Sequence, residues 1–270
     1  MEKKIIWLTS YPKCGNTYLR SFLSHYIHDD YTDFTFENLK KIKKFETKET
    51  FALANKFVNN PNNYITHSLE VQKELIKKLP QKNLIYKTHH FFGSIDGYQF
   101  TSEKYTLLFI YLIRDPREVL VSYAKHSGVS IDEMLNIITN EKKIYRSGFQ
   151  TLVSWGQNYR SWKSFKQVPS YFVKYEDLVL NPVKIFESII YFISRYTNIP
   201  YDQKKIREII ELTTFDKLKN LEKKTGFDEA EKSIFFRSGK ADSWKKVLNI
   251  EQIKTIEKVF EKEMKELKYI

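Results

Sequence analysis

Four short stretches of the sequence carry side chains that could bind an anion or move a proton. The first is residues 10–18, where Lys13 and Gly15 lie between an apolar run and an amphipathic one. A loop that leads from a strand into a helix directs several backbone N–H groups at one point, and the helix dipole favours an anion there. The stretch predicts a phosphate-binding loop, with an ordinary turn and an exposed lysine as the alternative. Because no Gly-Lys-Ser/Thr follows the glycine, it is not a Walker A loop, and we expect no metal site.

The second stretch combines a guanidinium with a hydroxyl. Arg114 follows the most apolar run of the chain, residues 106–113, and Ser122 lies eight residues further on. Open α/β sheets bind ligands at the carboxyl ends of their strands, and an arginine fork with a hydroxyl suits a phosphate monoester. The alternative is a surface ion pair of Arg114 or Arg117 with Asp115 or Glu118.

The third stretch places histidines at the end of a strand. His89 and His90 follow the expected strand of residues 83–88, which includes Lys87. A histidine with a pKa near neutrality can take a proton from an attacking hydroxyl, although a lone histidine is more often structural. Side chains alternate along a strand, so the two rings are expected to point in opposite directions.

The fourth stretch is a basic loop near the C-terminal end. Arg237, Ser238, Gly239 and Lys240 come shortly before Trp244. Two cations and a glycine in an irregular segment could close over a phosphate, and the alternative is a basic loop anchored by the tryptophan.

These stretches are separated by alternating strand and helix patterns. Buried strands are predicted for four short apolar runs, residues 5–8, 83–88, 106–113 and 171–174. Helical spacing predicts helices at residues 17–27, 36–45, 69–79 and 250–267, and after Pro116 and Pro182, whereas residues 222–243 are expected to be irregular. We therefore expect one domain, residues 1–270, of the α/β class. It has a central parallel sheet flanked by helices on both faces and a P-loop-like strand-loop-helix unit at the N-terminus.

The composition limits the possible partners. Lys and Arg number 45 against 33 Asp and Glu, a net charge of +12, which indicates either a lysine-rich surface or an anionic ligand. A single cysteine, Cys14, allows no disulfide within the chain, and no apolar run is long enough for a membrane span. The first strand begins too early to leave room for a signal peptide. These features predict a cytoplasmic protein.

Taken in order, the motifs resemble the cytosolic-type family of sulfotransferases that use 3′-phosphoadenosine 5′-phosphosulfate (PAPS). The resemblance runs from residue 5 to about 267. It consists of the Tyr-Pro-Lys-Cys-Gly-Asn loop at residues 11–16, Lys-Thr-His at 87–89, the Arg114 and Ser122 pair, Tyr-Glu-Asp at 175–177, and Arg237, Gly239, Trp244 and Lys245. Each motif is weak alone, and the ordered set is specific.

The resemblance implies a role for each matched residue. The 5′-phosphosulfate would be held by Lys13, Gly15, Asn16, Thr17 and Tyr18. The 3′-phosphate would be held by Arg114, Ser122, Arg237, Ser238 and Gly239. The adenine would be surrounded by Tyr18, Tyr175, Thr213 and Phe215. His89 would be the general base, with Lys13 and Lys87 stabilising the transferring and leaving oxygens. The product would be adenosine 3′,5′-bisphosphate (PAP).

Two other functions remain open at this point. Cys14 and Arg20 form a Cys-x₅-Arg pattern, the signature of cysteine-dependent phosphatases, in which Asp115 could serve as the acid. A non-catalytic protein could use the positive charge to bind a polyanion. Neither of these two functions explains the Lys-Thr-His strand end. We therefore expect an acceptor that bears a hydroxyl or an amine, and no nucleic acid partner. The sequence identifies neither the acceptor nor the oligomeric state.

Overall fold

The computed structural model describes residues 3–28, 33–56, 58–230, 234–236 and 243–270. Its centre is a five-stranded sheet in which all neighbouring strands are parallel. Across the sheet the strands lie in the order β2 (Lys43–Lys44), β3 (Leu84–Thr88), β1 (Ile5–Ser10), β6 (Thr106–Ile113) and β9 (Ser170–Lys174). The four strands predicted from apolar runs are the four adjacent strands β3, β1, β6 and β9.

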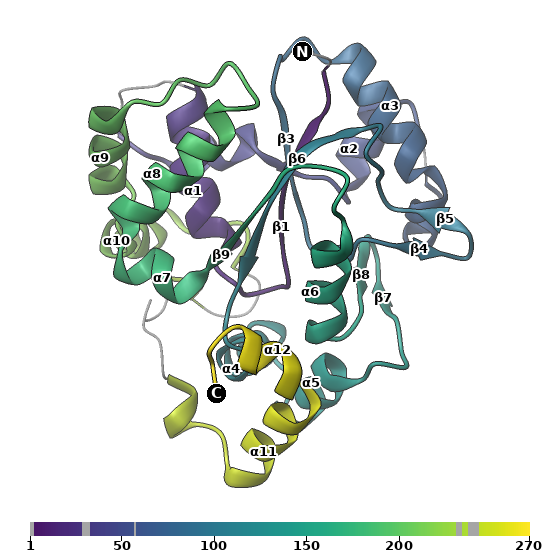
Figure 1. Ribbon diagram of the computed structural model, residues 1–270, viewed down its shortest axis with the longest axis vertical. Coiled ribbons are helices and arrows are strands. Elements are labelled where there is room, and N and C mark those ends of the chain that lie inside the picture. Colours follow the sequence, from purple (N-terminus) through teal and green to yellow (C-terminus); the bar gives the residue numbers. More distant parts are fainter. Residues whose placement is uncertain (1–2, 29–32, 57, 231–233, 237–242) are drawn as a thin grey trace.

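Helices cover both faces of this sheet, which confirms the predicted fold class (Figure 1). Alternate side chains of β1 enter different cores: Ile6 and Leu8 one, Ile5 and Trp7 the other. On the side of Ile6 lie α1 (Asn16–His28), α7 (Tyr175–Leu180), α8 (Pro182–Ser194), α9 (Gln203–Leu212) and α10 (Phe215–Thr225). On the side of Trp7 lie α2 (Lys48–Leu53), α3 (Ser68–Lys78), α4 (Pro116–Ser127), α5 (Ile131–Thr139), α6 (Trp155–Ser164), α11 (Ile250–Val259) and α12 (Glu261–Glu266).

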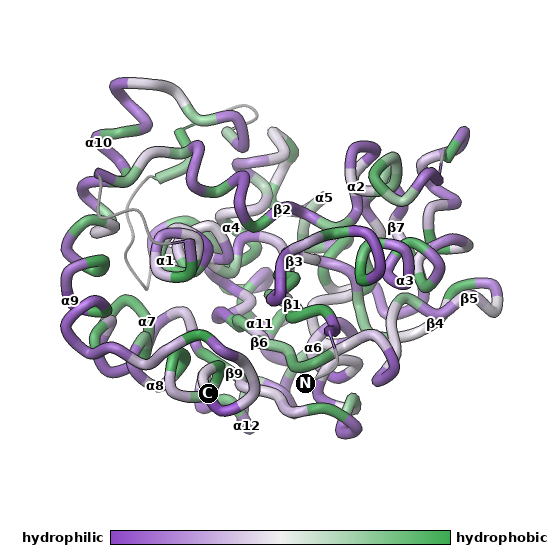
Figure 2. The backbone as a smooth tube through the Cα atoms, turned by 90° about the horizontal axis from the view of Figure 1, so that it is seen from above, coloured by the Kyte–Doolittle hydropathy of each residue, from purple (hydrophilic) through white to green (hydrophobic). Residues whose placement is uncertain are grey.

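Short elements connect these layers. Three are 3₁₀ helices, η1 (Phe36–Lys41), η2 (Pro61–His67) and η3 (Ser243–Lys246). Two antiparallel ribbons pair β4 (Ser94–Ile95) with β5 (Tyr98–Gln99), and β7 (Tyr145–Ser147) with β8 (Gln150–Leu152). In Figure 2 the green, hydrophobic segments concentrate toward the interior, and the surrounding helices show purple, hydrophilic turns outward.

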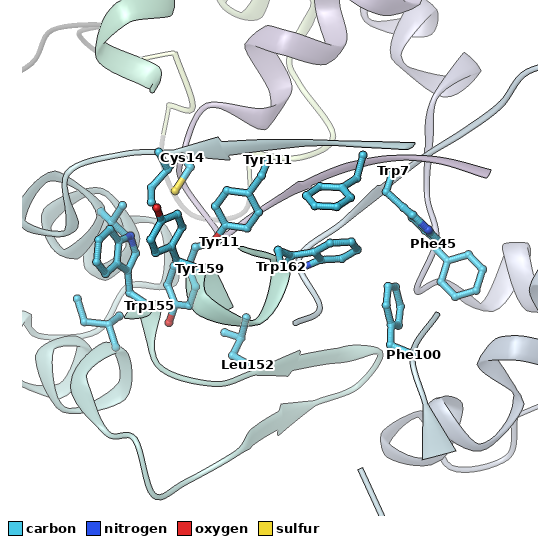
Figure 3. Packing of buried hydrophobic residues seen from close by; sticks show 14 of the residues in the cluster. Trp7, Tyr11, Cys14, Phe45, Phe100, Tyr111, Leu152, Trp155, Tyr159 and Trp162 are labelled. Atoms are coloured by element: carbon cyan, nitrogen blue, oxygen red, sulfur yellow. The ribbon is translucent and has the colours of Figure 1, made fainter. Parts of the chain in front are cut away.

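Aromatic side chains fill the core on the Trp7 side of the sheet (Figure 3). The Trp7 ring lies 5.1 Å from Phe45 and 5.2 Å from Phe100, centroid to centroid. Trp155 and Tyr159 of α6 pack further along the same layer. Large rings packed in this way hold the strand ends rigidly, which matters because the strand ends carry the candidate site.

Two predicted helices differ in the structure. Residues 36–45 form η1 and then the edge strand β2, in which Lys43 and Lys44 pair with Tyr86 and Lys87 of β3. Residues 250–267 form two helices, with Phe260 between them at φ −110°. The segment expected to be irregular is helical up to Thr225. Among the described residues, no helix is long and apolar enough to cross a membrane.

Candidate functional site

A cavity of about 430 Å³ opens at the carboxyl edge of the sheet. Parallel strands end at the same edge, so the residues that follow β1, β3, β6 and β9 meet there. Most residues predicted for the site line this cavity: Lys13, Gly15, Asn16, Thr17, Tyr18, Lys87, His89, Arg114, Ser122, Tyr175 and Phe215. Thr213 does not line it, and Arg237, Ser238 and Gly239 lie outside the described residues.

The loop between β1 and α1 has the conformation of an anion-binding turn. Lys13 and Gly15 both have positive φ, 66° and 91°, so the chain folds back tightly before α1 begins at Asn16. A Cβ atom on Gly15 would lie 2.3 Å from Cδ2 of Tyr175, so only glycine fits here. The Asn16 side chain donates hydrogen bonds to Leu8 O and Ser10 Oγ, both at 3.3 Å, which ties the helix start to the strand end.

His89 is oriented by the end of β1. Its Nδ1 lies 2.8 Å from the carbonyl oxygen of Ser10 and 3.2 Å from Ser10 Oγ. Because a carbonyl only accepts, Nδ1 carries the proton and Nε2 keeps its lone pair. Burial, together with the charges of Lys87 and Lys44, holds the pKa of His89 well below its usual range. The ring is therefore neutral at neutral pH, the state that a general base requires.

His90 lies on the other side of the chain, in the aromatic core. Its ring stacks between Phe91, at 4.7 Å, and Phe100, at 4.5 Å, and its Nδ1 lies 2.6 Å from Phe91 O. It does not line the cavity. Burial lowers the pKa of His90 to about 4. His89 thus lines the cavity and His90 lies in the core, in agreement with the expected alternation of the two rings.

Arg114 makes the ion pair that the sequence left as the alternative, and it lines the cavity as well. Its Nη2 lies 3.2 Å from Glu118 Oε2, its Nη1 donates to Lys13 O at 3.1 Å, and its guanidinium lies 4.4 Å from the Tyr175 ring centroid. The pair is buried rather than superficial. Ser122, two turns into α4, lines the same cavity. The structure thus shows a buried ion pair in place of the surface pair, with Arg114 and Ser122 at the cavity wall.

The residues predicted to surround an adenine are only partly brought together. Tyr18 and Phe215 line the cavity, and burial raises the pKa of Tyr18 to about 12. Tyr175 also lines it, but its ring packs against Arg114 and Gly15. Thr213 is fully buried, and its hydroxyl donates to Ile209 O at 2.8 Å. Its side chain is satisfied by its own helix and does not face the cavity.

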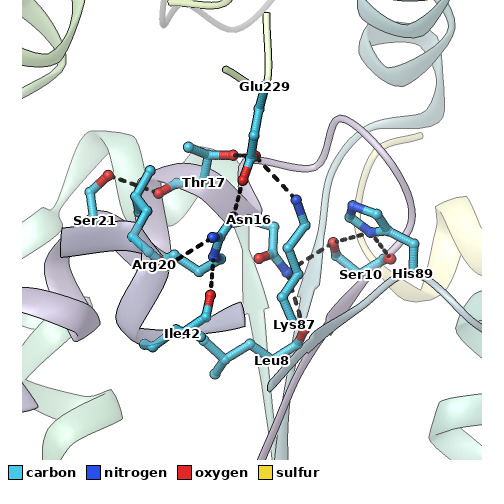
Figure 4. A network of polar contacts seen from close by, with 11 residues as sticks. Leu8, Ser10, Asn16, Thr17, Arg20, Ser21, Ile42, Lys87, His89 and Glu229 are labelled. Atoms are coloured by element: carbon cyan, nitrogen blue, oxygen red, sulfur yellow. Dashed lines mark hydrogen bonds and ion pairs between the residues drawn. The ribbon is translucent and has the colours of Figure 1, made fainter. Parts of the chain in front are cut away.

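Glu229 is the residue of this site that the sequence did not indicate (Figure 4). Its carboxylate pairs with Arg20 Nη1 at 2.6 Å and Lys87 Nζ at 3.3 Å, and accepts from Thr17 Oγ1 at 3.2 Å. Burial opposes ionisation, but Lys87 and Arg20 outweigh it and hold the pKa of the Glu229 carboxyl well below its usual range. Burial in turn lowers the pKa of Lys87 to about 8, against the opposing effect of Glu229.

The cysteine and arginine of the phosphatase pattern serve the fold. Cys14 is fully buried in the aromatic core and does not line the cavity (Figure 3). Burial raises the pKa of its thiol, so no nucleophilic thiolate is present at neutral pH. The Arg20 guanidinium donates to Leu39 O and Ile42 O, both at 3.2 Å, besides Glu229. This geometry does not support a cysteine-dependent phosphatase.

The described part of the chain contains no group of three His, Cys, Asp or Glu side chains that could hold a metal ion. The cavity is lined by cations and hydroxyls around the neutral imidazole of His89, together with the carboxylates of Asp228 and Glu229. Such a site suits an anionic ligand with two separated negative groups. One group would lie at the β1–α1 loop and the other near Arg114 and Ser122.

Comparisons with known proteins agree with this geometry. The family model of the sulfotransferase domain matches residues 3–268. Sulfotransferase 1B1 of Mus musculus is 25% identical over 267 residues, covering 96% of this chain and 82% of its own. Flavonol 3-sulfotransferase of Flaveria bidentis is 26% identical over 275 residues, covering 96% and 81%.

Two solved structures share the fold. A mouse sulfotransferase complexed with PAP has a TM-score of 0.63 at 17% identity, covering 97% of this chain and 84% of that one. Retinol dehydratase complexed with retinol and PAP also has a TM-score of 0.63, at 18% identity, covering 98% and 82%.

Proposed function

We propose that this chain, which belongs to the sulfotransferase domain family, transfers a sulfuryl group from PAPS to a hydroxyl or amine. The observation that carries the proposal is the cavity itself. The β1–α1 loop, the Arg114 and Ser122 pair, and the His89 and Lys87 pair all line it. An anion cradle, a second phosphate site and an oriented neutral base in one cavity are the parts that this reaction needs.

The two ends of the nucleotide would lie on different elements. The 5′-phosphosulfate lies at the start of α1, where Lys13, Gly15, Asn16 and Thr17 line the cavity. The 3′-phosphate lies against Arg114 and Ser122, with the predicted residues Arg237, Ser238 and Gly239 as further ligands. The adenine lies between Tyr18 and Phe215. We assign Thr213 no contact with the adenine, because it does not line the cavity.

Transfer then needs one proton acceptor and a concentration of positive charge. The acceptor oxygen or nitrogen attacks sulfur as the bond from sulfur to the 5′-phosphate oxygen breaks, and His89 Nε2 takes the proton. Lys87 and Lys13 stabilise the charge on the transferring group and on the leaving phosphate oxygen. PAP is the leaving group. As in phosphoryl transfer, positioning and electrostatic stabilisation supply most of the rate.

The acceptor carries a hydroxyl or an amine and enters beside His89. Relatives of this chain include a flavonol sulfotransferase, a hydroxysteroid sulfotransferase and an amine sulfotransferase. In this chain Lys44, Tyr123 and Gln150 line the same cavity as His89 and would surround the acceptor. We place the reaction in the cytoplasm, because a relative is named a cytosolic sulfotransferase. We place it in one domain that spans the chain, because that relative matches 96% of this chain.

The test is an acceptor screen with labelled PAPS, read by mass spectrometry, with p-nitrophenyl phosphate in a parallel assay. We expect a sulfated product and an equal amount of PAP with at least one hydroxyl or amine compound, and no release of p-nitrophenol. Release of p-nitrophenol without sulfate transfer would restore the phosphatase. Binding of polyanions with neither reaction would support a non-catalytic protein.

The pH dependence of kcat/KM for PAPS should report His89 and Lys87. The free-enzyme pKa of His89 is depressed, so the base stays neutral, and the rate stays high, as the pH falls past 6.5, the unperturbed histidine value. Lys87 acts as an ammonium, so the rate should fall as the pH rises through about 8. Lys87→Arg should move the alkaline limb to higher pH. An acid limb at or above 6.5, or an alkaline limb that Lys87→Arg leaves in place, would contradict these assignments.

A further inference from the structure

Glu229 occupies the position where the proposed function requires an anion. Its carboxylate lies against a hydroxyl in the first turn of α1, Thr17 Oγ1, and against the ammonium of Lys87. The same carboxylate is held by Arg20, a cation that the sequence did not assign to the site. Each of these three groups donates a hydrogen bond and therefore fits a phosphate or sulfate oxygen as well as a carboxylate oxygen.

We propose that Glu229 is an internal competitor of the nucleotide. In the free protein its carboxylate holds the anion position at the start of α1, and the 5′-phosphosulfate of PAPS must displace it in order to bind. This inference rests on the proposed function, because it takes the occupant of that position to be PAPS. It makes Glu229 a residue that determines how tightly, and through which group, the nucleotide binds.

The first argument concerns charge. The Lys87 and Arg20 side chains are 10% and 4% exposed, and buried cations are costly unless a counter-ion pairs with them. Glu229 supplies that counter-ion in the free protein, and the phosphosulfate would supply it in the complex. A carboxylate and a phosphosulfate on the same donors would repel each other. The two anions are therefore alternatives.

The second argument concerns what holds Glu229 in place. Its side chain is 33% exposed, and it lies in the turn just after α10, beyond the Gly226 cap with φ 75°. Among the described residues its polar contacts are with Thr17, Arg20 and Lys87, and it belongs to none of the hydrophobic core clusters there. The carboxylate can thus leave the cations by a local movement that uncovers little apolar surface.

Competition of this kind lowers the observed affinity without changing the bound complex. The measured Kd equals the intrinsic Kd divided by the fraction of protein in which the position is open. Glu229→Gln keeps the shape of the side chain and removes its charge, so it opens the position. We expect PAP to bind about tenfold more tightly to Glu229→Gln, the effect of losing one charged hydrogen bond in the competing state.

The experiment is calorimetric titration of the full chain with two probes. PAP carries both phosphates, whereas adenosine 3′-phosphate lacks the 5′ group and has no need to displace Glu229. Only PAP should gain affinity in Glu229→Gln. Titration at about pH 6, below the pKa of about 8 that Lys87 has beside Glu229, favours the charged ammonium when Glu229→Gln removes the stabilising carboxylate.

Asp228→Asn is the matched control. Asp228 lines the same cavity and carries the same charge, but the carboxylate that pairs with Arg20, Lys87 and Thr17 is that of Glu229. The two substitutions change the net charge of the cavity equally, so a gain confined to Glu229→Gln identifies the occupied position. An equal gain in both variants means general electrostatics and overturns the proposal.

Two further results would also overturn it. Weaker binding of PAP to Glu229→Gln would make Glu229 a support that positions Lys87 in the complex. Equal binding, or a gain with adenosine 3′-phosphate as well, would show that the carboxylate does not compete with the 5′ group. If PAP fails to bind the unaltered protein at all, the proposed function fails first, and that result is distinguishable from the others.

Discussion

Replacing His89 by asparagine should lower turnover by about 10²–10⁴-fold while leaving nucleotide affinity almost unchanged. Asparagine preserves a side-chain donor toward Ser10 O but has no basic nitrogen for the proton of the acceptor. The loss should appear in kcat, measured with saturating PAPS and acceptor. PAP binding, measured by calorimetry, should stay within a fewfold of the original value, because the proposed function places His89 at the acceptor rather than at a phosphate.

His90→Asn is the matched control, because it makes the same exchange at the adjacent residue. His90 is 1% exposed and stacks between Phe91 and Phe100, so its replacement disturbs packing and lowers the free energy of unfolding. The turnover of the folded fraction should change little, which circular dichroism and active-site titration together can establish. A larger loss of turnover in His90→Asn than in His89→Asn would reverse the assignment.

The sequence predicted the edge of the sheet better than it predicted the sides of the cavity. Residues that follow an apolar run, such as Arg114 after residues 106–113, are placed by the strand itself, and parallel pairing brings them to one edge. The position of the β1–α1 loop was also predicted, because Gly15 lies between an apolar run and a helical pattern, whereas the positive φ of Lys13 was not. Local patterns of this kind require no knowledge of the rest of the fold.

Contacts between distant segments were not predictable in this way. Glu229 meets Thr17 and Arg20 across 212 and 209 residues of sequence, from a turn with no periodic pattern. The edge strand β2 has only two residues, both lysines, and its pairing with β3 decides its conformation. Thr213 was assigned from the family pattern, but its hydroxyl bonds to the preceding turn of α9. In each case tertiary contacts or local hydrogen bonds outweigh the sequence pattern.

Replacing Arg114 should remove the selectivity of the site for a 3′-phosphate. The unaltered protein is expected to bind PAP far more tightly than AMP, which carries only the 5′-phosphate. The guanidinium donates from Nη1 to Lys13 O and from Nη2 to Glu118. Each of these nitrogens carries a second N–H, so donor capacity remains for an anion at the cavity wall. In Arg114→Ala the affinity for PAP should fall about tenfold to a hundredfold, with AMP nearly unaffected.

Arg114→Ala also removes the ion-pair partner of Glu118, and this structural effect must be separated from the loss of a phosphate ligand. Glu118 also accepts hydrogen bonds from Ser243 Oγ at 2.9 Å and from Trp244 N at 3.0 Å, so its carboxylate stays partly satisfied in Arg114→Ala. Arg114→Lys keeps the charge beside Glu118 but lacks the planar fork. It should therefore fold normally and still lose part of the preference for PAP over AMP.

Arg117→Lys provides the matched control for this pair of variants. Arg117 lies one turn further along the chain, pairs with Asp115 at 2.6 Å and stacks 4.1 Å from the Trp244 ring, but it does not line the cavity. In Arg117→Lys the ratio of the AMP to the PAP dissociation constant should match that of the unaltered protein. The ratio depends on the 3′-phosphate alone, since both nucleotides carry the 5′-phosphate and displace Glu229 equally. If Arg114→Ala keeps the original ratio, or if Arg117→Lys loses it, the 3′-phosphate does not bind at Arg114.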